Sequence, residues 1–372
     1  MKRTILYLAA AAMLTPMSAC NDDDEPNVKR EYAEEETPSR TAPAFAFGAD
    51  PSWVTAMEDA NWKFRDAAGN EGDCLSILRG IGFNACRLRV WVNPADGYCD
   101  MADMVRKAVR AYNMGYHIMV DFHYSDRWAD PGAQYKPSVW DGCETLDAMA
   151  DKLYQYTKKV LTAVRTNGVD VAWVQIGNET RGGMIQYNSD GSASDVNGKM
   201  GADYVKLHAA GCKAAKEVYP RCKTVVHFEG GNETSKIVWA LDKMKAAGAE
   251  YDIFGVSLYP DMDADGWYQD YVSTTIDNLN MVHETYGCDV MVCEVGCDVS
   301  HSDAKMMLND VVVRCQKEVP SCKGVFYWEP ECYNPGDGAW NGYNKGGFLS
   351  DGRPSEALLN AFSGKADSVM GM

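Results

Sequence analysis

The residues best suited to chemistry in this chain are two glutamates, each placed directly after an apolar run. Glu179 follows Asn178 in Gln-Ile-Gly-Asn-Glu, and Glu294 ends the sequence Met-Val-Cys-Glu. Two carboxyl groups facing one bond can hydrolyse a glycosidic linkage: one protonates the leaving oxygen, and the other attacks the anomeric carbon or activates a water. A lone carboxylate at a strand end is usually only solvated, so this chemistry requires that the fold bring both acids to one point.

The rhythm of apolar runs and amphipathic segments indicates how the acids are positioned. Eight short runs lack the alternation of half-exposed strands, which is typical of strands buried on both faces; they are residues 44–49, 85–92, 116–124, 171–177, 224–228, 253–259, 290–295 and 324–328. Amphipathic helices are expected between most of them, at 100–114, 146–167, 202–219, 235–247, 274–286 and 303–319. This alternation predicts an α/β fold, a single (β/α)8 TIM barrel over residues 43–365. An open doubly wound sheet is the alternative, but it calls for a glycine-rich phosphate turn after the first strand, which Gly48-Ala49-Asp50-Pro51 is not.

Polar and aromatic residues collect after the predicted strands, whereas the strands begin with Gly, Lys, Tyr or Asp. Besides the two glutamates they are Arg87, Arg89, Trp91, Asn93, Asp121, His123, Tyr124, Asp126, Trp128, Asn178, His227, Glu229, Tyr259, Trp328 and Glu329. Solvation alone would place polar residues at both ends of the strands alike. The asymmetry therefore favours an active site at the carboxyl ends, where the loops of such barrels carry the chemistry.

Several longer motifs resemble those of the retaining (β/α)8 glycoside hydrolases and, more narrowly, the arabinogalactan endo-β-1,4-galactanases of glycoside hydrolase family 53. The matching stretches are Phe-Gly-Ala-Asp-Pro-Ser-Trp (47–53), Arg-Leu-Arg-Val-Trp-Val-Asn-Pro (87–94), Asp-Phe-His-Tyr-Ser-Asp (121–126), Trp-Ala-Asp-Pro-Gly (128–132), Gln-Ile-Gly-Asn-Glu (175–179), Tyr-Pro (259–260) and Tyr-Trp-Glu-Pro (327–330). The likeness runs from about Ala44 to Phe362. It implies hydrolysis of β-1,4-galactosidic bonds in (arabino)galactan side chains of pectin, by a two-glutamate double displacement that retains configuration.

The resemblance also implies roles for individual residues. Glu179 is expected to be the acid/base and Glu294 the nucleophile. Substrate-binding and supporting roles are implied for Asn178 at the sugar 2-OH, Arg89 and Tyr259 at the nucleophile, Trp328 as the floor of the cleft, and Trp128, His123 and His227 along its walls. Arg87 is expected in a barrel-wall ion pair instead. Asp121 and His227 each have a structural alternative, as a buried acid and as a core histidine.

The chain departs from the family pattern at two places near the site. Val295-Gly296-Cys297-Asp298 follows the nucleophile position, where the family usually has an aromatic residue. Leu258 precedes Tyr259, where the family often has a second tyrosine. One subsite contact is therefore not accounted for by the sequence.

Two other functions remain open at this stage. One is a non-catalytic glycan-binding surface lipoprotein on the same fold, and the other is a related retaining barrel hydrolase with mannan or glucan specificity. Retention of both carboxylates together with Asn178, Arg89 and Tyr259 argues against the first. No cofactor is expected to be required and no metal ligands are assigned, although a structural calcium near Asp298, Asp303, Asp337 and Asp351 is an alternative suggested by the family.

The overall charge limits the classes of partner. The net charge is −17 and the pI about 4.8, which argues against nucleic acid, because such binding depends on Lys and Arg. The 10 Trp and 20 Tyr are compatible with rings that stack on sugars, and equally with an aromatic core. We expect a β-1,4-galactan polysaccharide as partner and a monomeric enzyme.

The N-terminus has the features of an export signal. Residues 1–19 read as a lipoprotein signal peptide, because Lys2 and Arg3 precede a short apolar stretch and small residues precede Cys20. Residues 20–42 are expected to be a lipidated Cys20 and an acidic, disordered tether, and residues 366–372 a short tail. We therefore expect attachment to the outer membrane through the lipid anchor only, at the cell surface, with the periplasm as the alternative.

Twelve of the 13 cysteines remain once Cys20 is set aside. Cys212 with Cys222, and Cys315 with Cys322, each bracket the end of a predicted helix and the next strand. An exported protein permits two short-loop disulfides there. The alternative is that these cysteines are unpaired small hydrophobes.

Overall fold

The computed structural model describes residues 40–194, 196–262, 267–335 and 340–363, and they form a closed eight-stranded parallel barrel. Its strands are β1 (Ala46–Asp50), β4 (Ala85–Val90), β5 (His117–Phe122), β6 (Val171–Ile176), β9 (Lys223–Phe228), β10 (Ile253–Leu258), β11 (Asp289–Val295) and β12 (Cys322–Trp328). Their order around the barrel is β1-β12-β11-β10-β9-β6-β5-β4, and β1 pairs with β4 to close it. The predicted (β/α)8 TIM barrel and all eight predicted strands are confirmed.

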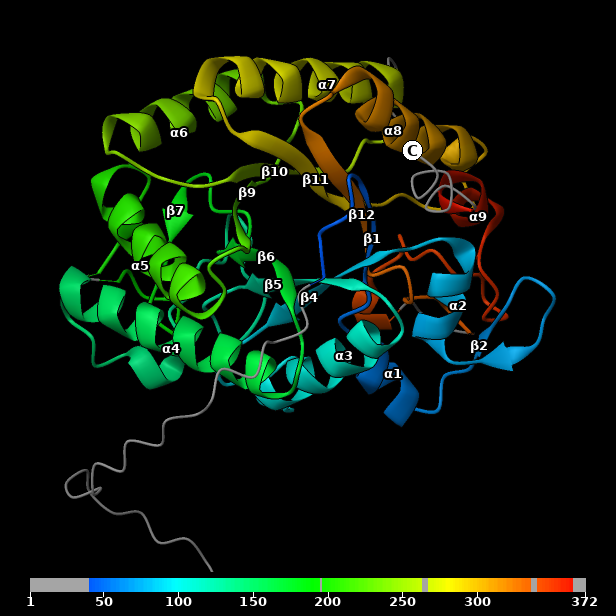
Figure 1. The fold of residues 1–372 in the computed structure, drawn as a ribbon, viewed down its shortest axis with the longest axis horizontal. Helices are drawn as coiled ribbons and strands as arrows, with labels where there is room; N and C mark the ends of the chain where they lie inside the picture. The colour runs from blue at the N-terminus through cyan, green and yellow to red at the C-terminus, as the bar shows by residue number, and fades with distance from the viewer. Residues whose placement is uncertain (1–39, 195, 263–266, 336–339, 364–372) are drawn as a thin grey trace, which may run out of the picture. The chain divides into compact units, whose positions relative to one another are not determined.

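Helices surround the strands on the outside (Figure 1). They are α2 (Cys74–Ile81), α3 (Met101–Asn113), α4 (Leu146–Thr166), α5 (Ala202–Val218), α6 (Thr234–Ala246), α7 (Trp267–Tyr286), α8 (Ala304–Glu318) and α9 (Glu356–Phe362), with a short α1 (Val54–Asp59) in the first loop. The six predicted helices are present, but α7 begins at Trp267 rather than at 274, and α2 and α9 were not predicted. Both are short, at 8 and 7 residues, so a periodic pattern has little length in which to show.

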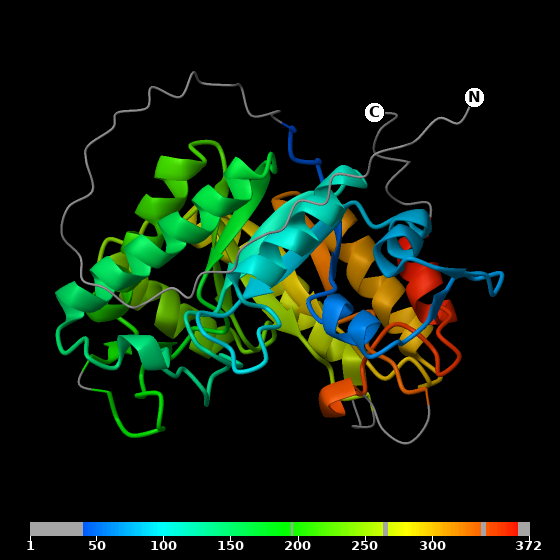
Figure 2. The same cartoon turned by 90° about the horizontal axis from the view of Figure 1, so that it is seen from below.

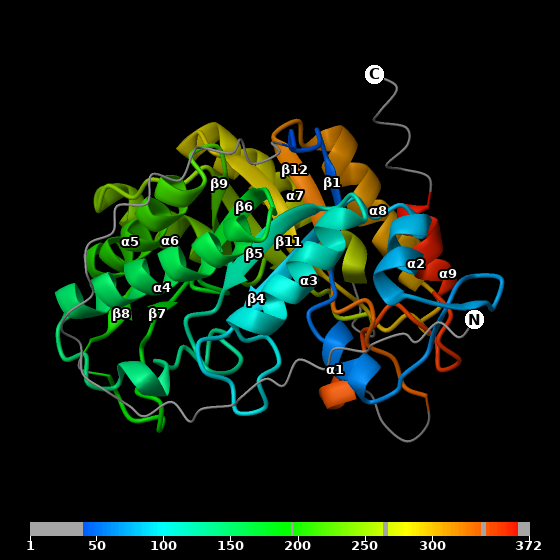
Figure 3. The ribbon, with the colours of Figure 1, turned by 60° about the horizontal axis from the view of Figure 1, so that its bottom comes forward.

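The loops after the strands carry small elements of their own. Two-stranded hairpins are formed by β2 (Phe64–Arg65) with β3 (Glu71–Gly72) and by β7 (Gly183–Met184) with β8 (Gly198–Lys199), and single 3-10 turns by η1 (Ser138–Trp140) and η2 (Trp340–Gly342). Figures 2 and 3 show the orange turn η2 beside the blue helix α1. The Trp340 ring lies 6.3 Å from that of Trp53, so the first and last loops of the barrel meet at this end.

The barrel interior consists of two layers, because alternate residues of each strand point inward. The lower layer is an apolar cluster of Ala46, Ala85, Met119, Trp173, Val225, Ile253, Met291, Cys293 and Phe326. Two residues further along several of the same strands come Arg87, Asp121, Gln175 and His227, all fully buried. The strands therefore carry an apolar plug and, above it, a polar layer that faces the carboxyl ends.

A bulge in β11 sets the register beneath Glu294. Val256 pairs with Val292, but the next residue of β10, Ser257, pairs with Glu294, so Cys293 is the extra residue. A Cβ added at Gly255 would lie 2.3 Å from the Cys293 sulfur, so the glycine makes room for the bulge. The bulge turns both Cys293 and Glu294 toward the interior and brings Glu294 beside Ser257.

Several expectations concern residues at the edges of this domain. The signal peptide, Cys20, most of the tether and the 366–372 tail lie outside the described residues. At the end of the predicted tether, Arg40 donates to the carbonyls of Tyr112 and Tyr116, so contacts with the barrel begin at least there. Across the described part of the chain, no helix combines the length and apolar character needed to cross a membrane.

All twelve cysteines of the described residues carry free thiols. The alternative of two short disulfides, Cys212–Cys222 and Cys315–Cys322, is therefore not what the structure shows. Eleven of the twelve are buried, and Cys212 is partly exposed. They pack as small hydrophobes.

Candidate active site

Glu179 and Glu294 meet in a cleft of about 320 Å³ at the carboxyl ends of the strands. The cleft is lined by His123, Trp128, Ala129, Asp130, Asn178, Glu179, Tyr259, Glu294, Trp328, Tyr343 and Lys345. The Ser257 hydroxyl oxygen lies 2.6 Å from Glu179 Oε1 and 3.5 Å from Glu294 Oε2. These two carboxyl oxygens are therefore no more than about 6 Å apart, within reach of one sugar linkage.

Glu179 is held in an unusual backbone conformation where β6 ends. Its φ is +48°, in the left-handed region that few non-glycine residues adopt, and Gly177 just before it has φ +86°. The next amide, that of Thr180, donates to the carbonyl of His227 and holds the turn against β9. Such strain persists where surrounding contacts hold it, and here it aims the Glu179 carboxyl into the cleft.

The surroundings of Glu179 favour its protonated form. Burial raises the pKa of Glu179 to about 8, and the nearby Glu294 adds to the rise. Smaller contributions come from Glu229 and Asp130, whereas a hydrogen bond with Ser257 opposes the rise. A carboxyl group with such a pKa can carry a proton to a leaving oxygen near neutral pH.

Glu294 has two partners that stabilise its charged form. Arg87 Nη2 lies 3.0 Å from its Oε1, and the Tyr259 hydroxyl donates to its Oε2 at 2.9 Å. Burial still raises the pKa of Glu294 to about 7, while Arg87 opposes that rise. Because a guanidinium touches Glu294 and none in the described part of the chain touches Glu179, the first proton leaves Glu294 and the remaining one stays on Glu179.

Of the two arginines of β4, Arg87 makes the expected ion pairs within the barrel, but Arg89 does not make the expected contact with Glu294. Arg87 contacts Glu294, and it also binds Asp50 at 2.6 Å and Asp121 at 3.0 Å. Arg89, the expected partner of the nucleophile, instead pairs with Glu329. The guanidinium of Arg89 lies under the Trp128 ring at 4.3 Å and does not line the cleft. The role assigned to Arg89 was wrong and belongs to Arg87, because the lower residue on the strand is level with Glu294.

Asn178 lines the cleft, and its side-chain amide is oriented by its neighbours. Its Nδ2 donates to the carbonyl of Ala129 at 2.8 Å, and its Oδ1 accepts from Arg87 Nη2 at 2.8 Å. His227 does not line the cleft, contrary to expectation. It is fully buried, with Nδ1 at 2.9 Å from Asn178 Oδ1 and Nε2 at 3.0 Å from the Ser257 hydroxyl.

Aromatic rings form the walls of the cleft. The Trp328 ring lies 5.5 Å from that of Trp128, 6.3 Å from that of Tyr259 and 4.6 Å from that of Tyr343. His123 joins them, hydrogen-bonded to Asp121 at 3.0 Å and accepting from the Trp91 indole at 3.1 Å. Flat rings around two acids suit a pyranose, whose apolar faces stack on them.

Some residues of this site were not identified from the sequence. Ser257, Gln175, Tyr343 and Lys345 had no assigned role, and Asp130 was noted only inside a motif. Tyr343 also bears on the missing aromatic after the nucleophile, since a Cβ at Gly296 would lie 2.7 Å from the Tyr343 hydroxyl. Gly296 thus leaves room for a ring from the loop after β12, which no local spacing could reveal.

Several acidic residues near the site already have partners in the described part of the chain. Among the described residues, the metal-ligating groups that come together are Glu329, Glu331 and Cys332, and there the Arg89 guanidinium is already the cation. Of the residues named for the alternative calcium site, Asp298 accepts from Ser300 and Asp351 pairs with Arg353. Asp337 lies outside the described residues.

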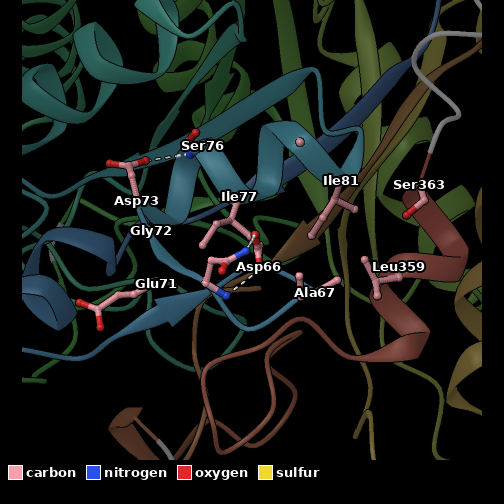
Figure 4. A pocket seen from close by; sticks show the side chains of 13 residues that line it. Asp66, Ala67, Glu71, Gly72, Asp73, Ser76, Ile77, Ile81, Leu359 and Ser363 are labelled. Atoms are coloured by element: carbon pink, nitrogen blue, oxygen red, sulfur yellow. Dashed lines mark hydrogen bonds between the residues drawn. The ribbon is translucent and has the colours of Figure 1, made fainter.

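A second groove lies away from the cleft, between α2, the β2–β3 hairpin and α9 (Figure 4). Its volume is about 560 Å³, but no aromatic ring lines it. Its charged groups have partners, since Asp73 caps α2 through the Ser76 amide and pairs with Arg110, and Glu71 pairs with Lys63. Among the described residues that line the groove, these acids are held by partners of their own, whereas Glu179 and Glu294 of the cleft share a contact with one hydroxyl.

Comparison with known proteins agrees with this geometry. The family model described as glycosyl hydrolase family 53 matches residues 46–362. A probable arabinogalactan endo-beta-1,4-galactanase A of Neosartorya fischeri is 30% identical over 311 residues, covering 76% of this chain and 83% of the relative. An endo-beta-1,4-galactanase of Bacillus subtilis is 30% identical over 320 residues, covering 77% of this chain and 70% of the relative.

Solved structures show the same architecture. A fungal beta-1,4-galactanase superposes with a TM-score of 0.74 at 25% identity, covering 86% of this chain and 99% of the other. The catalytic domain of an Ignisphaera aggregans family 53 enzyme gives a TM-score of 0.73 at 25% identity, covering 88% and 98%. The cleft with two acids, the barrel and the matched residues lead to one conclusion: the chain belongs to glycosyl hydrolase family 53.

Proposed function

We propose that this glycoside hydrolase cleaves internal β-1,4-galactosidic bonds of galactan, including the (arabino)galactan side chains of pectin, with retention of configuration. The substrate class is supported by the relatives named as galactanases. The observation that carries the mechanism is the contact of one hydroxyl, that of Ser257, with both acids. The distance between Glu179 Oε1 and Glu294 Oε2 is therefore at most about 6 Å. This upper limit lies below the ~6.5–9.5 Å range of inverting enzymes and is compatible with the ~5–5.5 Å of retaining ones.

In the first step, the Glu294 carboxylate attacks the anomeric carbon while Glu179 gives its proton to the departing oxygen. The C–O bond to the leaving sugar breaks, and a glycosyl ester forms on Glu294. In the second step, a water gives one proton to Glu179 and its oxygen to the anomeric carbon, which releases Glu294. Arg87 and Tyr259 hold the charge on Glu294 before and after the ester exists.

The proposal is tested by incubating the purified enzyme with β-1,4-galactan, mannan and xylan. We expect short galacto-oligosaccharides from galactan alone, and the first product to be the β-anomer by proton NMR. Products from mannan or xylan in place of galactan would overturn the substrate assignment, and an initial α-anomer would overturn retention.

Variants of the two acids assign their roles. Glu294→Gln is expected to lose at least about 10³-fold in kcat on galactan, and Glu179→Ala to lose as much on galactan but far less on an aryl galactoside whose leaving group needs no proton. Glu144→Gln is a control, since this exposed acid is not one of the residues that line the cleft. Full activity of Glu294→Gln would falsify the nucleophile assignment. Galactan binding without turnover in the unaltered protein would favour a glycan-binding function.

The location of the enzyme is a separate proposal, supported by the N-terminal sequence. We propose that the chain is cut before Cys20, lipidated there and held at the outer membrane, facing outward. Incorporation of labelled palmitate into the full-length chain, lost in Cys20→Ser, tests lipidation. Protease treatment of intact cells then separates a surface location from a periplasmic one.

A further inference from the structure

Ser257 has a buried hydroxyl that lies between Glu179 and His227. Ser257 lies on β10, one residue before the strand ends, and is 2% exposed. Its Oγ is 2.6 Å from Glu179 Oε1 and 3.0 Å from His227 Nε2. A hydroxyl has one proton to donate, so it can donate to only one of these neighbours at a time.

The tautomer of His227 follows from the neighbours of Asn178. Asn178 Nδ2 is committed to the Ala129 carbonyl, and Oδ1 accepts from Arg87, so the amide cannot be turned over without opposing like groups. His227 Nδ1 is 2.9 Å from that same oxygen, which can only accept. Two donors also lie near Nδ1, the side-chain amide of Gln175 at 3.2 Å and the backbone amide of Glu179 at 3.4 Å. The 2.9 Å contact with an acceptor oxygen is the shortest of the three, so it places the proton on Nδ1, which then donates to Asn178 Oδ1.

The other ring nitrogen of His227 is then an acceptor. Burial, with Arg87 adding to the effect, lowers the pKa of His227 well below its usual value, so the ring is neutral and Nε2 has no proton. The group beside Nε2 is the Ser257 hydroxyl, which donates to it. Its oxygen is left to accept, and the neighbour within reach that can donate to it is Glu179 in the protonated form.

We propose that Ser257 is a positioning residue whose hydroxyl changes direction as Glu179 alternates between acid and base. With Glu179 protonated, the carboxyl donates to Ser257 and Ser257 donates to His227. After Glu179 has given its proton to the leaving oxygen, the Ser257 hydroxyl turns to donate to the carboxylate, and His227 Nε2 is left without that donor. When water returns a proton to Glu179, the hydroxyl turns back. This inference rests on the proposed function of Glu179 as acid/base.

The other charged groups around Glu179 and His227 are the same in every variant that is compared. Glu179 faces Glu294 of β11, Glu229 after β9 and Asp130 after β5. His227 faces Arg87 of β4, with Asp121 of β5 and His123 just after it. None of these is changed in the test below, so shifts between variants report on the hydroxyl and its two partners.

The test measures protonation of Glu179 directly, by NMR titration of the full-length protein labelled with ¹³C at the glutamate carboxyl carbons. Glu179→Gln identifies the signal. Ser257→Ala is expected to raise the pKa of Glu179, because a donor to a carboxylate is worth more than an acceptor for a carboxylic acid. His227→Phe removes the competing acceptor and should lower the pKa of Glu179, by about half to one unit.

The decisive comparison is the effect of His227→Phe in two backgrounds. It should lower the pKa of Glu179 more when Ser257 is present than in Ser257→Ala, since the double-variant cycle isolates the route through the hydroxyl. Equal effects in the two backgrounds would overturn the proposal, as would an unchanged pKa in Ser257→Ala. If His227→Phe does not fold, an unchanged pKa of Glu179 in Ser257→Ala still overturns the proposal.

Ser321→Ala is the matched control. The Ser321 hydroxyl is also buried and has no hydrogen-bond partner among the residues that the structure describes, but it lies just before β12, at the opposite end of the barrel. Its removal should leave the Glu179 titration and galactan hydrolysis unchanged. Because the titration needs no substrate, failure of the unaltered enzyme to cleave galactan would count against the proposed function, and an unmoved titration would count against the hydroxyl switch.

Discussion

The two layers inside the barrel come from the same strands and yet have opposite properties. The lower layer is the apolar cluster that contains Ala46 and Phe326, and it is closely packed around Trp173. The upper layer places Arg87 among Asp50, Asp121 and Glu294, all nearly or fully buried. Apolar burial stabilises the fold, whereas buried charges carry a desolvation penalty that their pairing only partly offsets. The upper layer is therefore explained by what it does for Glu294 and not by stability.

The largest expected effect comes from removing the cation of the upper layer. Arg87→Met leaves Asp50 and Asp121 buried without their partner, so stability should fall by about 3–5 kcal/mol. Arg87 also keeps the pKa of Glu294 down, so its loss raises that pKa and moves the acid limb of the kcat/KM profile to higher pH. We expect kcat/KM at neutral pH to fall by about 10²–10³-fold. Guanidinium unfolding and initial rates over a pH series measure both effects.

Arg89→Met is the matched comparison, two residues further along β4. It removes the partner of Glu329, and that residue lies beside Glu331 rather than beside the nucleophile. Stability should fall, but the acid limb should stay where it is. If the limb moved in Arg89→Met and not in Arg87→Met, the original expectation for Arg89 would be restored and the reassignment rejected.

The difference between Arg87 and Arg89 also shows which features of the site can be predicted from the sequence. Alternation along β4 places Arg87 and Arg89 on the same inward face, so their inward direction was predictable. Which of them is level with Glu294 depends on the stagger between strands and on the bulge at Cys293. Those properties arise from the pairing between strands, which one sequence does not contain.

Other parts of the site also divide into features that the sequence predicts and features that depend on the three-dimensional arrangement. Eight uniformly apolar runs and the two glutamates after them were enough to predict the barrel and the pair of acids. His227 was expected on the cleft wall and is found behind Asn178, because its side chain lies deeper in the barrel than the side chains that line the cleft. Ser257 gave no signal at all, since a serine on an apolar strand is common and its position between two functional groups appears only in three dimensions.

The next prediction concerns the lower layer. Trp173 is 2% exposed, and its ring lies 6.1 Å from that of Phe326. Trp173→Ala should reduce stability by about 3–5 kcal/mol through the cavity it leaves. Activity per folded molecule, measured well below the melting temperature, should stay within a few-fold of the original.

Trp239→Ala provides the control for that change. Trp239 lies on the outer surface of α6 and is 48% exposed, so its removal should alter stability by less than about 0.5 kcal/mol. A loss of activity in Trp173→Ala as large as in Arg87→Met would mean that the two layers are coupled, and that the apolar plug positions the acids directly.

The smallest expected effect separates one hydrogen bond of the upper layer from its charges. Tyr259→Phe removes the donor to Glu294 Oε2 and keeps the ring in the cleft wall. Burial raises the pKa of the Tyr259 phenol well above its usual value, so in the unaltered enzyme it is a donor at any working pH.

Losing this donor destabilises the Glu294 carboxylate by about 1.4 kcal/mol, which corresponds to about tenfold in kcat/KM. The pKa of Glu294 rises, so the acid limb again moves to higher pH, but by less than in Arg87→Met because no charge is removed. Tyr343→Phe is the matched control: its hydroxyl donates to the Trp328 carbonyl and not to an acid, so the limb should not move. If the acid limb of the kcat/KM profile lay at the same pH in Tyr259→Phe and Tyr343→Phe, Arg87 alone would set the charge on Glu294. The upper layer would then act through its ion pairs, without a contribution from the cleft wall.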